Sequence, residues 1–349
     1  MKQVSKGKVR NSRPTVERLQ KIVDAFCEVQ ISVVGDTVLD EFVYGEIARV
    51  SREAPVLILD HRRTDPIPGG AGNAAANLAA LDVKTTLIGR IGSDAASRSL
   101  IALLDSCGID VSSLVEDPSY ETPTKTRVLA GSPHTAKQQI VRIDRGNACT
   151  PLRASLRKKI LTRARRARRA GHGVLLADYG YGTVCPDLAA DIRMGSGALT
   201  LDSRYALSRF RGVDAATPNL EELERSLGRR IDDDDLETLV ESAATLRRRI
   251  GCGALLVTRG SRGMTLVEKG RKGAKHIPAF GGGEIADVTG AGDTVIAVFT
   301  AARSAGASWL EAAELANVAG GLVVMKRGTA TITRKEILHA LQDGAESFS

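Results

Sequence analysis

The sequence predicts an α/β protein with a mostly parallel sheet, helices on both faces and a small β-strand lid. Composition is the first reason, because 43% of the 349 residues are hydrophobic, only 3% are aromatic, and 35 are glycine. This mixture suits helices packed closely on a sheet. The second reason is that short apolar strands alternate with helical patterns along most of the chain, which is typical of parallel sheets covered on both faces. The third is a pair of strand-like insertions, near 41–66 and 120–145, that interrupt this alternation.

The N-terminal part of the chain supplies the first helices and strands. TVERLQKIVDAF, residues 15–26, predicts a helix with Thr15 as its N-cap. ISVVGD, residues 31–36, predicts a buried strand that ends in Gly-Asp. After the first insertion we expect a glycine turn with an alanine-rich helix, a strand and a helix, over 68–81, 84–92 and 94–107.

The remaining chain repeats the alternation. Strands are expected in the second insertion over 124–130 and 138–144, and a basic helix over 153–169. Further apolar strands, each followed by a helical pattern, are expected over 173–180, 198–204, 215–220 and 254–260. Because ligands of open α/β folds bind at the carboxyl edge of the sheet, we interpret the two insertions as one lid over that edge.

The net charge of +8 comes from one segment, 153–169, which holds nine Lys or Arg residues and no acid. Without this segment the protein is close to neutral. Leu156, Ile160 and Leu161 recur in it at helical spacing, so we expect a solvated helix with a narrow apolar stripe and its charges on the other faces. The alternative is a basic protein that binds nucleic acid through this helix. We expect no such binding, because neither interleaved aromatics nor a known reading motif accompanies the charges.

The cysteines and the apolar runs bear on the compartment. Five cysteines are dispersed without a Cys-x-x-Cys pair, which indicates reduced thiols and neither a disulfide framework nor a zinc site. No run of 18 apolar residues exists, and residues 1–20 lack an apolar signal core. We therefore expect a cytoplasmic protein without a membrane partner. The run of four Asp residues at 232–235 fits negative charge at a helix N-terminus better than a metal site.

Two glycine-rich stretches are candidates for binding phosphate, although no P-loop motif occurs. GAGNAA, residues 70–75, loosely matches a dinucleotide fingerprint, but it does not directly follow a strand. An oxidoreductase that binds a dinucleotide there is therefore a weaker alternative.

DVTGAGDT, residues 287–294, is the more informative stretch, since it precedes a helical pattern. Gly290 and Gly292 let backbone N–H groups approach an anion at the helix start. Asp293 beside them could take a proton from an attacking hydroxyl, as phosphoryl transfer to an alcohol requires. A glycine turn with an N-capping Asp is the structural alternative.

These two stretches resemble the signatures of one enzyme family. DVTGAGDT resembles the C-terminal signature of the ribokinase-like (pfkB) carbohydrate kinases, and PGGAGNAAANLAAL resembles their N-terminal one. The similarity spans 30–342, which implies one ribokinase-like kinase domain between a basic extension with the first helix (1–29) and a tail (343–349). Within the family, several motifs resemble the D-glycero-D-manno-heptose 7-phosphate kinases, namely VVGDTVLDEFVYGEIARVSREAPV, TKTRVL, QQIVRID, LADYGYG, TPNLEELE and LLVTRGSRGM.

The resemblance implies an ATP-dependent, Mg²⁺-assisted kinase that phosphorylates the anomeric hydroxyl of the heptose phosphate. It implies that Asp293 is the catalytic base, beside an anion hole formed by Gly290, Ala291 and Gly292. The sugar would be held by Asp36, Gly69, Gly70 and Asn73, and its phosphate by Lys125 and Arg142. The nucleotide would meet Arg204, Asn219, Thr258, Gly260, Gly263 and Asn317. Glu222 would position Mg²⁺ through water, while Asp287 and Thr289 match positions that hold a monovalent cation such as K⁺ in some relatives.

Two departures leave the acceptor open. Tyr181 replaces a lysine of the heptose kinases, and their Asp-Pro-Lys reads Asp-Ser-Arg here, with Arg204 in place of lysine. Another sugar, sugar phosphate or nucleoside therefore remains an alternative acceptor, and solvated strand charge remains an alternative role for Lys125 and Arg142. Bifunctional relatives add a nucleotidyltransferase domain, and we expect only the kinase half in this chain. The exposed lid further suggests a homodimer formed through it.

Overall fold

A computed structural model describes residues 14–131, 137–146, 152–281, 287–326 and 328–344. Its main sheet has the strand order β12-β11-β10-β9-β8-β7-β1-β3-β4, and the strands from β4 to β10 run parallel. The α/β class is thereby confirmed. The strands are β1 (Gln30–Val50), β2 (Leu57–Gly70), β3 (Lys84–Ile91), β4 (Leu114–Glu116), β5 (Thr124–Gly131), β6 (Gln138–Arg145), β7 (Gly173–Asp178), β8 (Leu199–Ser203), β9 (Ala215–Ala216), β10 (Ala254–Thr258), β11 (Met264–Glu268) and β12 (Lys275–Ile277).

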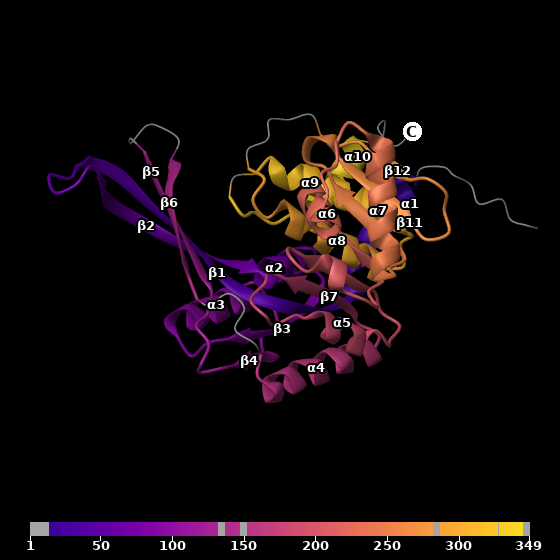
Figure 1. Ribbon diagram of the computed structural model, residues 1–349, viewed down its shortest axis with the longest axis horizontal. Coiled ribbons are helices and arrows are strands. Elements are labelled where there is room, and N and C mark those ends of the chain that lie inside the picture. The colour runs from indigo at the N-terminus through magenta and orange to yellow at the C-terminus, as the bar shows by residue number, and fades with distance from the viewer. Residues whose placement is uncertain (1–13, 132–136, 147–151, 282–286, 327, 345–349) are drawn as a thin grey trace, which may run out of the picture.

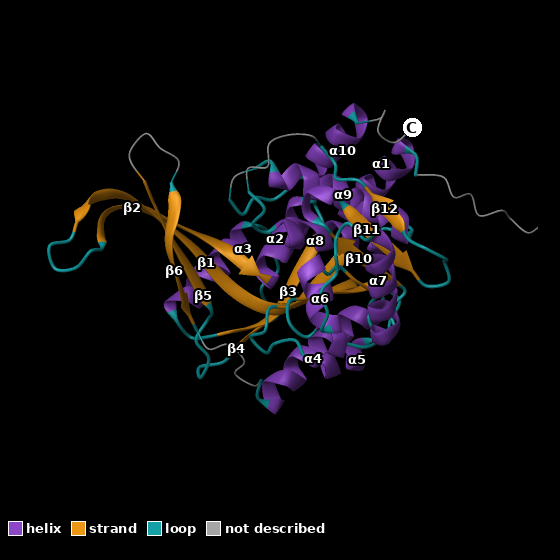
Figure 2. Cartoon of the chain, turned by 45° about the horizontal axis from the view of Figure 1, so that its top comes forward, coloured by secondary structure: helices purple, strands orange, loops and turns teal. Residues whose placement is uncertain are grey.

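Helices cover both faces of this sheet (Figure 2). One face packs on the first three and last three helices around Phe26 and Phe299, and the other packs on the central four around Ile160 and Phe210. Thr15 caps the first helix as expected, by accepting a hydrogen bond from the backbone N–H of Arg18. The helices are α1 (Val16–Asp24), α2 (Ala71–Ala80), α3 (Ala95–Ser106), α4 (Ala154–Arg169), α5 (Pro186–Ile192), α6 (Leu220–Leu227), α7 (Leu236–Ile250), α8 (Ala291–Ser304), α9 (Trp309–Val324) and α10 (Arg334–Asp343).

The lid is a four-stranded sheet, β2-β1-β5-β6, that projects from one end of the body (Figure 1). Our expectation of a first strand that ends at 36 was wrong, because β1 continues from the body into the lid without a break. Its residues 30–36 pair with β3, whereas residues from Thr37 onward pair with β2. A polar Gly-Asp pair does not end the strand here, since the buried Asp36 carboxylate accepts backbone hydrogen bonds from a neighbouring loop.

The segment after β10 differs from the expectation as well. We expected a helical pattern after residues 254–260, but the chain turns back as β11, which pairs antiparallel with β10, and then as β12, which pairs antiparallel with β11. Gly260 and Gly263 have φ values of 56° and 80° in the connecting turn, which favour glycine and let the chain reverse. The strand expected over 215–220 is only two residues long, and the edge strand β4 was missed because three residues show no readable alternation.

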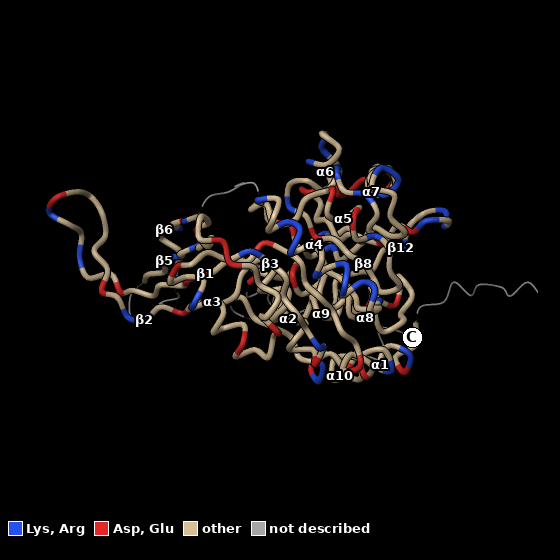
Figure 3. Tube along the Cα trace, turned by 90° about the horizontal axis from the view of Figure 1, so that it is seen from below, with Lys and Arg blue, Asp and Glu red and all other residues tan. Residues whose placement is uncertain are grey.

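The basic helix is confirmed as α4, with Leu156 and Ile160 buried and Leu161 partly buried. One charge departs from the expected pattern, since Arg168 is buried and donates to main-chain carbonyls of the 192–197 segment. Asp191 on α5 pairs with two further arginines of α4. Figure 3 shows acidic and basic residues mixed over the lid and the body, so α4 is one charged surface among several. This arrangement favours the interpretation as a solvated helix.

The acidic run 232–235 supplies a helix cap, as expected. Asp235 caps α7, while Asp233 and Asp234 form ion pairs with Arg259 and Arg262. Within the described part of the chain, no group of three His, Cys, Asp or Glu residues could hold a metal ion, and no helix could cross a membrane. The four described cysteines are free thiols, whereas Cys149 lies outside the described residues, as do 1–13 of the predicted extension and 345–349 of the predicted tail.

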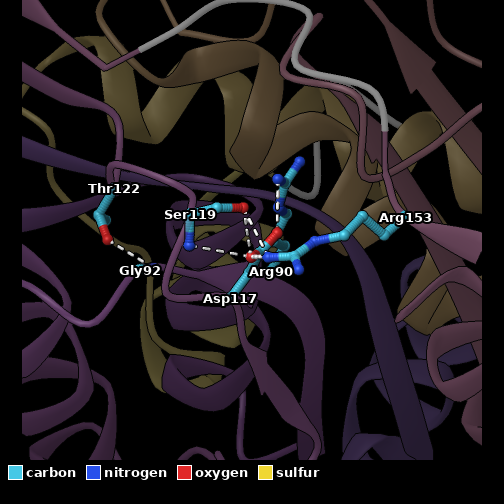
Figure 4. Close-up of polar contacts among 6 residues, drawn as sticks. All are labelled: Arg90, Gly92, Asp117, Ser119, Thr122 and Arg153. Carbon is cyan, nitrogen blue, oxygen red and sulfur yellow. Dashed lines mark hydrogen bonds and ion pairs between the residues drawn. The ribbon is translucent and has the colours of Figure 1, made fainter. Parts of the chain in front are cut away.

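A buried ion pair ties the end of β3 to the segment that leads into the lid (Figure 4). Arg90 Nη2 donates to Asp117 Oδ2 over 2.6 Å, and the side chains are 1% and 0% exposed. The other carboxylate oxygen accepts from Arg153 at the start of α4, and from the backbone and hydroxyl of Ser119. The Arg90 guanidinium also stacks 3.9 Å from the centroid of the Tyr120 ring. The cluster therefore joins β3, the β4–β5 connection and α4.

Candidate active site

The N-terminus of α8 is built as the glycine-rich motif predicts. Gly290 is its N-cap with a φ of 80°, and Asp293 lies in the first turn. Asp287 stabilises the preceding turn, since its carboxylate accepts hydrogen bonds from the backbone N–H groups of Thr289 and Gly328. These contacts lower the pKa of Asp287, although burial opposes them. The first N–H groups of α8 have no partner within the helix, so this end offers donors and partial positive charge to an anion.

Asp293 has a defined partner on each carboxylate oxygen. Oδ2 accepts from Asn73 Nδ2 of α2 over 2.5 Å, and Oδ1 accepts from the Tyr179 hydroxyl in the loop after β7. The next residue, Thr294, donates its hydroxyl to Asn77 Oδ1, one turn after Asn73 on α2, and this bond also fastens α8 to α2. Burial raises the pKa of Asp293, and the hydrogen bonds from Tyr179 and Asn73 partly oppose that rise. A carboxylate whose pKa is raised toward neutrality is a better proton acceptor for a hydroxyl group.

A cavity of about 350 Å³ opens beside this helix start. Ala291 and Gly292 line it together with four residues that the resemblance assigns to the nucleotide, namely Thr258, Gly260, Gly263 and Asn317. Other parts of its wall are apolar, with Val295 and Phe280, or bare backbone, with Gly320 and Gly321. Apolar side chains suit a flat base, and the free N–H groups at the start of α8 suit phosphates, so the cavity fits a nucleotide.

Two other residues assigned to the nucleotide, Arg204 and Asn219, are not among the described residues that line this cavity. Asn219 caps α6: its Oδ1 accepts from the Glu222 backbone over 2.8 Å, and the Glu222 carboxylate accepts from the Asn219 backbone over 3.0 Å. The Asn-x-x-Glu spacing is therefore that of a capping box. Burial raises the pKa of Glu222, and burial together with the Glu222 charge raises the pKa of Asp202 at the end of β8.

The residues assigned to the sugar lie where β1 leaves the body. Asp36 is fully buried, and its carboxylate accepts from the backbone N–H groups of Tyr179, Tyr181 and Thr183. Gly70 starts α2 with a φ of 57°, and a Cβ there would lie 2.6 Å from the carbonyl oxygen of Asp36. In the structure Asp36 holds the loop after β7, while its contact with a sugar stays a prediction.

The lid residues assigned to a phosphate differ in their surroundings. Lys125 is partly buried, its ammonium nitrogen lies 5.7 Å from the Tyr181 ring centroid, and burial lowers its pKa. Arg142 is exposed and pairs with Asp144 over 2.8 Å. The registers of β1, β5 and β6 place Lys125 beside Asp40 and Asp144, and Arg142 two residues further out along the same face. Tyr181, the departure from the heptose kinases, therefore supplies an aromatic face to Lys125.

Sequence reasoning missed three side chains of this site. Tyr179 contacts Asp293 directly, Asp202 lies within electrostatic range of Asp293, and Asp40 pairs with Arg127 of the lid over 2.7 Å. The available signal was position, because Tyr179 and Asp202 stand at the carboxyl ends of β7 and β8. Asp40 had no such signal, since it lies in the middle of a strand.

Comparisons with known proteins agree with this geometry. Residues 30–336 match the model of the family described as pfkB family carbohydrate kinase. The bifunctional protein HldE of Nitrosococcus oceani is 40% identical over 323 residues, which cover 92% of this chain and 65% of that protein. The bifunctional protein HldE of Mesorhizobium japonicum is 36% identical over 338 residues, covering 95% of this chain and 66% of that protein. The chain thus spans about two thirds of the length of these relatives.

Solved structures share the fold. The ribokinase of Arabidopsis thaliana, complexed with ribose and ATP, aligns with a TM-score of 0.70 and 22% identity over 90% of this chain and 99% of that one. Phosphofructokinase-2 of Escherichia coli, in complex with potassium, aligns with a TM-score of 0.73 and 17% identity over 90% and 98% of the two chains. The fold and the glycine-rich helix start with its carboxylate define a phosphotransferase that acts on a sugar hydroxyl. The chain belongs to the pfkB family of carbohydrate kinases.

Gly292 allows a test of the anion cradle that leaves the fold intact. A Cβ at this position meets no atom within 4 Å, so packing does not require glycine there. Because the methyl group would occupy the space before the helix N-terminus, we expect Gly292→Ala to lower kcat by about 10²-fold through misplacement of the transferring group. Thermal unfolding should stay within a few degrees of the parent's, since alanine favours the helix. The rate is measured as ADP release. Turnover of Gly292→Ala at the parent's rate would show that the transferring group does not occupy the space beside residue 292.

Proposed function

We propose that this chain transfers the γ-phosphoryl group of ATP to the anomeric hydroxyl of D-glycero-D-manno-heptose 7-phosphate. The observation that carries the proposal is the place of Asp293, at a glycine-rich helix N-terminus that borders a cavity suited to a nucleotide. Similarity to the HldE proteins over nine-tenths of the chain supports the acceptor. Because the chain spans about two thirds of those proteins, the proposal concerns the kinase step alone.

The residues would divide the reaction between them as follows. Asp293 takes the proton from the acceptor hydroxyl, whose oxygen bonds to the γ-phosphorus while the bond from that phosphorus to the β–γ bridging oxygen breaks, and ADP leaves. Backbone N–H groups of residues 290–292 stabilise the charge that gathers on the transferring group. Lys125 would attract the distal phosphate of the acceptor from the lid, and lid closure would exclude water.

Metal ions would assist from two places. Mg²⁺ neutralises the phosphates of bound ATP in this class of reaction. Asp202 and Glu222 would fit such a cation, because a positive charge beside two partly buried carboxyls with raised pKa values is electrostatically favourable. We propose that Asp287 and Thr289 hold a monovalent cation such as K⁺, and this part of the proposal rests on the resemblance alone. In the structure both carboxylate oxygens of Asp287 accept hydrogen bonds from backbone N–H groups.

The acceptor is tested by measuring ADP release with Mg-ATP across a panel of acceptors. The panel contains D-glycero-D-manno-heptose 7-phosphate, the same heptose without phosphate, hexose phosphates and nucleosides. The highest kcat/KM for the heptose phosphate would support the proposal. Faster turnover of another sugar phosphate or a nucleoside would support kinase activity but contradict the heptose acceptor. Tyr181 and Arg204 would then be the residues expected to cause the change of acceptor. Absence of turnover on every acceptor would overturn the proposed function.

A homodimer through the lid is the second part of this proposal. The lid strands and their connection expose apolar side chains that a partner could cover, namely Ile47, Val50, Val56, Leu57, Ile140, Val141 and Ile143. We expect sedimentation equilibrium to give twice the chain mass of 37.0 kDa at micromolar concentration. A double substitution, Val141→Lys with Ile143→Lys, should convert the dimer to a monomer that remains folded. A monomer mass for the parent at every concentration would contradict this assembly.

A further inference from the structure

The loop that follows β7 connects the body sheet to Asp293, the proposed catalytic base. Tyr179 belongs to this loop and makes one contact with its backbone and another with its side chain. Its backbone N–H donates to Asp36 Oδ2 over 2.9 Å, and its hydroxyl donates to Asp293 Oδ1. One residue therefore links a carboxylate of β1 to a carboxylate of α8.

The loop is held firmly before any ligand binds. Asp36 accepts three backbone hydrogen bonds from it, and Asp178 accepts one from Gly180 over 3.1 Å and another from the Ser203 hydroxyl over 2.7 Å. Both carboxylates are buried, where such contacts are stronger than in water. The phenol of Tyr179 therefore reaches Asp293 from a rigid support.

Asp293 depends on this support because it has few other neighbours to orient it. Oδ2 is held by Asn73 alone among the described residues, and Oδ1 by Tyr179. The charged groups that face Asp293 are Arg204 and Asp202 from the end of β8 and Asp40 from the lid, and within the described residues the carboxylate accepts its hydrogen bonds from Asn73 and Tyr179. With Oδ1 and Oδ2 each occupied once, one lone pair remains on each oxygen for an incoming hydroxyl.

We infer that Tyr179 is a positioning residue for the base, which holds Asp293 Oδ1 so that a free lone pair of the carboxylate faces the acceptor hydroxyl. This role rests on the proposed function, since it concerns the same proton transfer. The Tyr179 hydroxyl does not take the proton of the acceptor. It keeps its own proton and its hydrogen bond to Asp293 Oδ1 while the proton of the acceptor hydroxyl passes to the Asp293 carboxylate. A hydrogen bond to the charged form also favours ionised Asp293, so loss of the hydroxyl should raise the pKa of that carboxyl further.

The test compares Tyr179→Phe with Tyr120→Phe in the full chain. Tyr120 is a matched control, because it is buried and its hydroxyl has no hydrogen-bond partner in the described structure. We expect Tyr179→Phe to lower kcat by about 10- to 100-fold, the effect of losing a hydrogen bond to a charged group, with KM for ATP unchanged. The acid limb of the kcat profile should move to higher pH, whereas Tyr120→Phe should match the parent in both. A parent-like rate and acid limb in Tyr179→Phe would overturn the inference.

A second measurement separates this inference from the proposed function. Titration of the ¹³C carboxyl signal of Asp293 by NMR needs no turnover, and its midpoint should rise in Tyr179→Phe relative to the parent. If the parent turns over no acceptor but the midpoint still rises, the contact stands and the proposed function fails. If the parent is active but the midpoint does not change, Tyr179 does not position Asp293.

Discussion

Replacement of Asp293 by asparagine should lower kcat for phosphoryl transfer by about 10²- to 10⁴-fold, the usual contribution of a positioned general base. Asparagine keeps the shape of the side chain but cannot take the acceptor proton. It also offers one oxygen where two donors, Tyr179 and Asn73, now find an acceptor each, so the site should lose a little stability as well. The rate is measured as ADP release at saturating acceptor.

ATP affinity is the control for this variant. Four of the residues assigned to the nucleotide line the cavity beside α8 without involving the Asp293 side chain, so the Kd for ATP from calorimetry should stay close to the parent's. Loss of ATP binding together with turnover would mean that Asp293 supports the nucleotide site and not the proton transfer. A variant that turns over at the parent's rate would exclude Asp293 as the base.

The second large effect concerns stability and does not involve the active site. Asp117→Asn should lower the free energy of unfolding by about 3–5 kcal/mol, because it removes the carboxylate charge that lies 2.6 Å from the buried guanidinium of Arg90. Urea unfolding at neutral pH measures this difference. Asp191→Asn is the matched control, since Asp191 also pairs with two arginines but is 37% exposed, and its replacement should cost less than about 1 kcal/mol. Equal effects of the two substitutions would contradict the importance of burial.

The same carboxylate predicts a pH dependence. Hydrogen bonds from Ser119, Arg153 and Arg90 outweigh burial and lower the pKa of Asp117 from 3.8 to about 2. A carboxyl whose pKa is lower in the folded state contributes its full stability above the unfolded value, and this contribution is lost as the pH falls toward the folded value. The difference between the parent and Asp117→Asn should therefore be constant above about pH 5 and shrink between pH 4 and pH 2. A constant difference over that range would show that charge is not the cause.

Local sequence pattern was sufficient for the fold class and for the position of Asp293, the proposed base. Strand and helix periods predicted the body of the sheet and most helices. The glycines before a small-residue helix predicted Asp293 in its first turn. The resemblance then named Thr258, Gly260, Gly263 and Asn317, which the structure brings to one cavity. These features depend on residues that are close in sequence, or on a motif long enough to be specific.

Other features could not be inferred from local pattern. The Asn-x-x-Glu motif closes a capping box, so its spacing alone did not separate a helix start from a nucleotide contact. The continuation of β1 into the lid could not be predicted, because the Asp36 carboxylate that would end the strand accepts hydrogen bonds from a loop 143 to 147 residues away. The strand β11 was not predicted either, because its conformation depends on antiparallel pairing with β10 and not on its own residues alone.

By itself, then, the sequence determined an α/β kinase with a lid and a carboxylate at a glycine-rich helix start. The tertiary structure alone decided what that carboxylate touches. Asn73 and Tyr179 stand 220 and 114 residues before Asp293 in the chain, and they reach it only after α2, β7 and α8 meet at one edge of the sheet. Periodicity reports how a segment buries its own face, whereas a hydrogen bond between distant side chains depends on how whole elements pack, which no short stretch encodes.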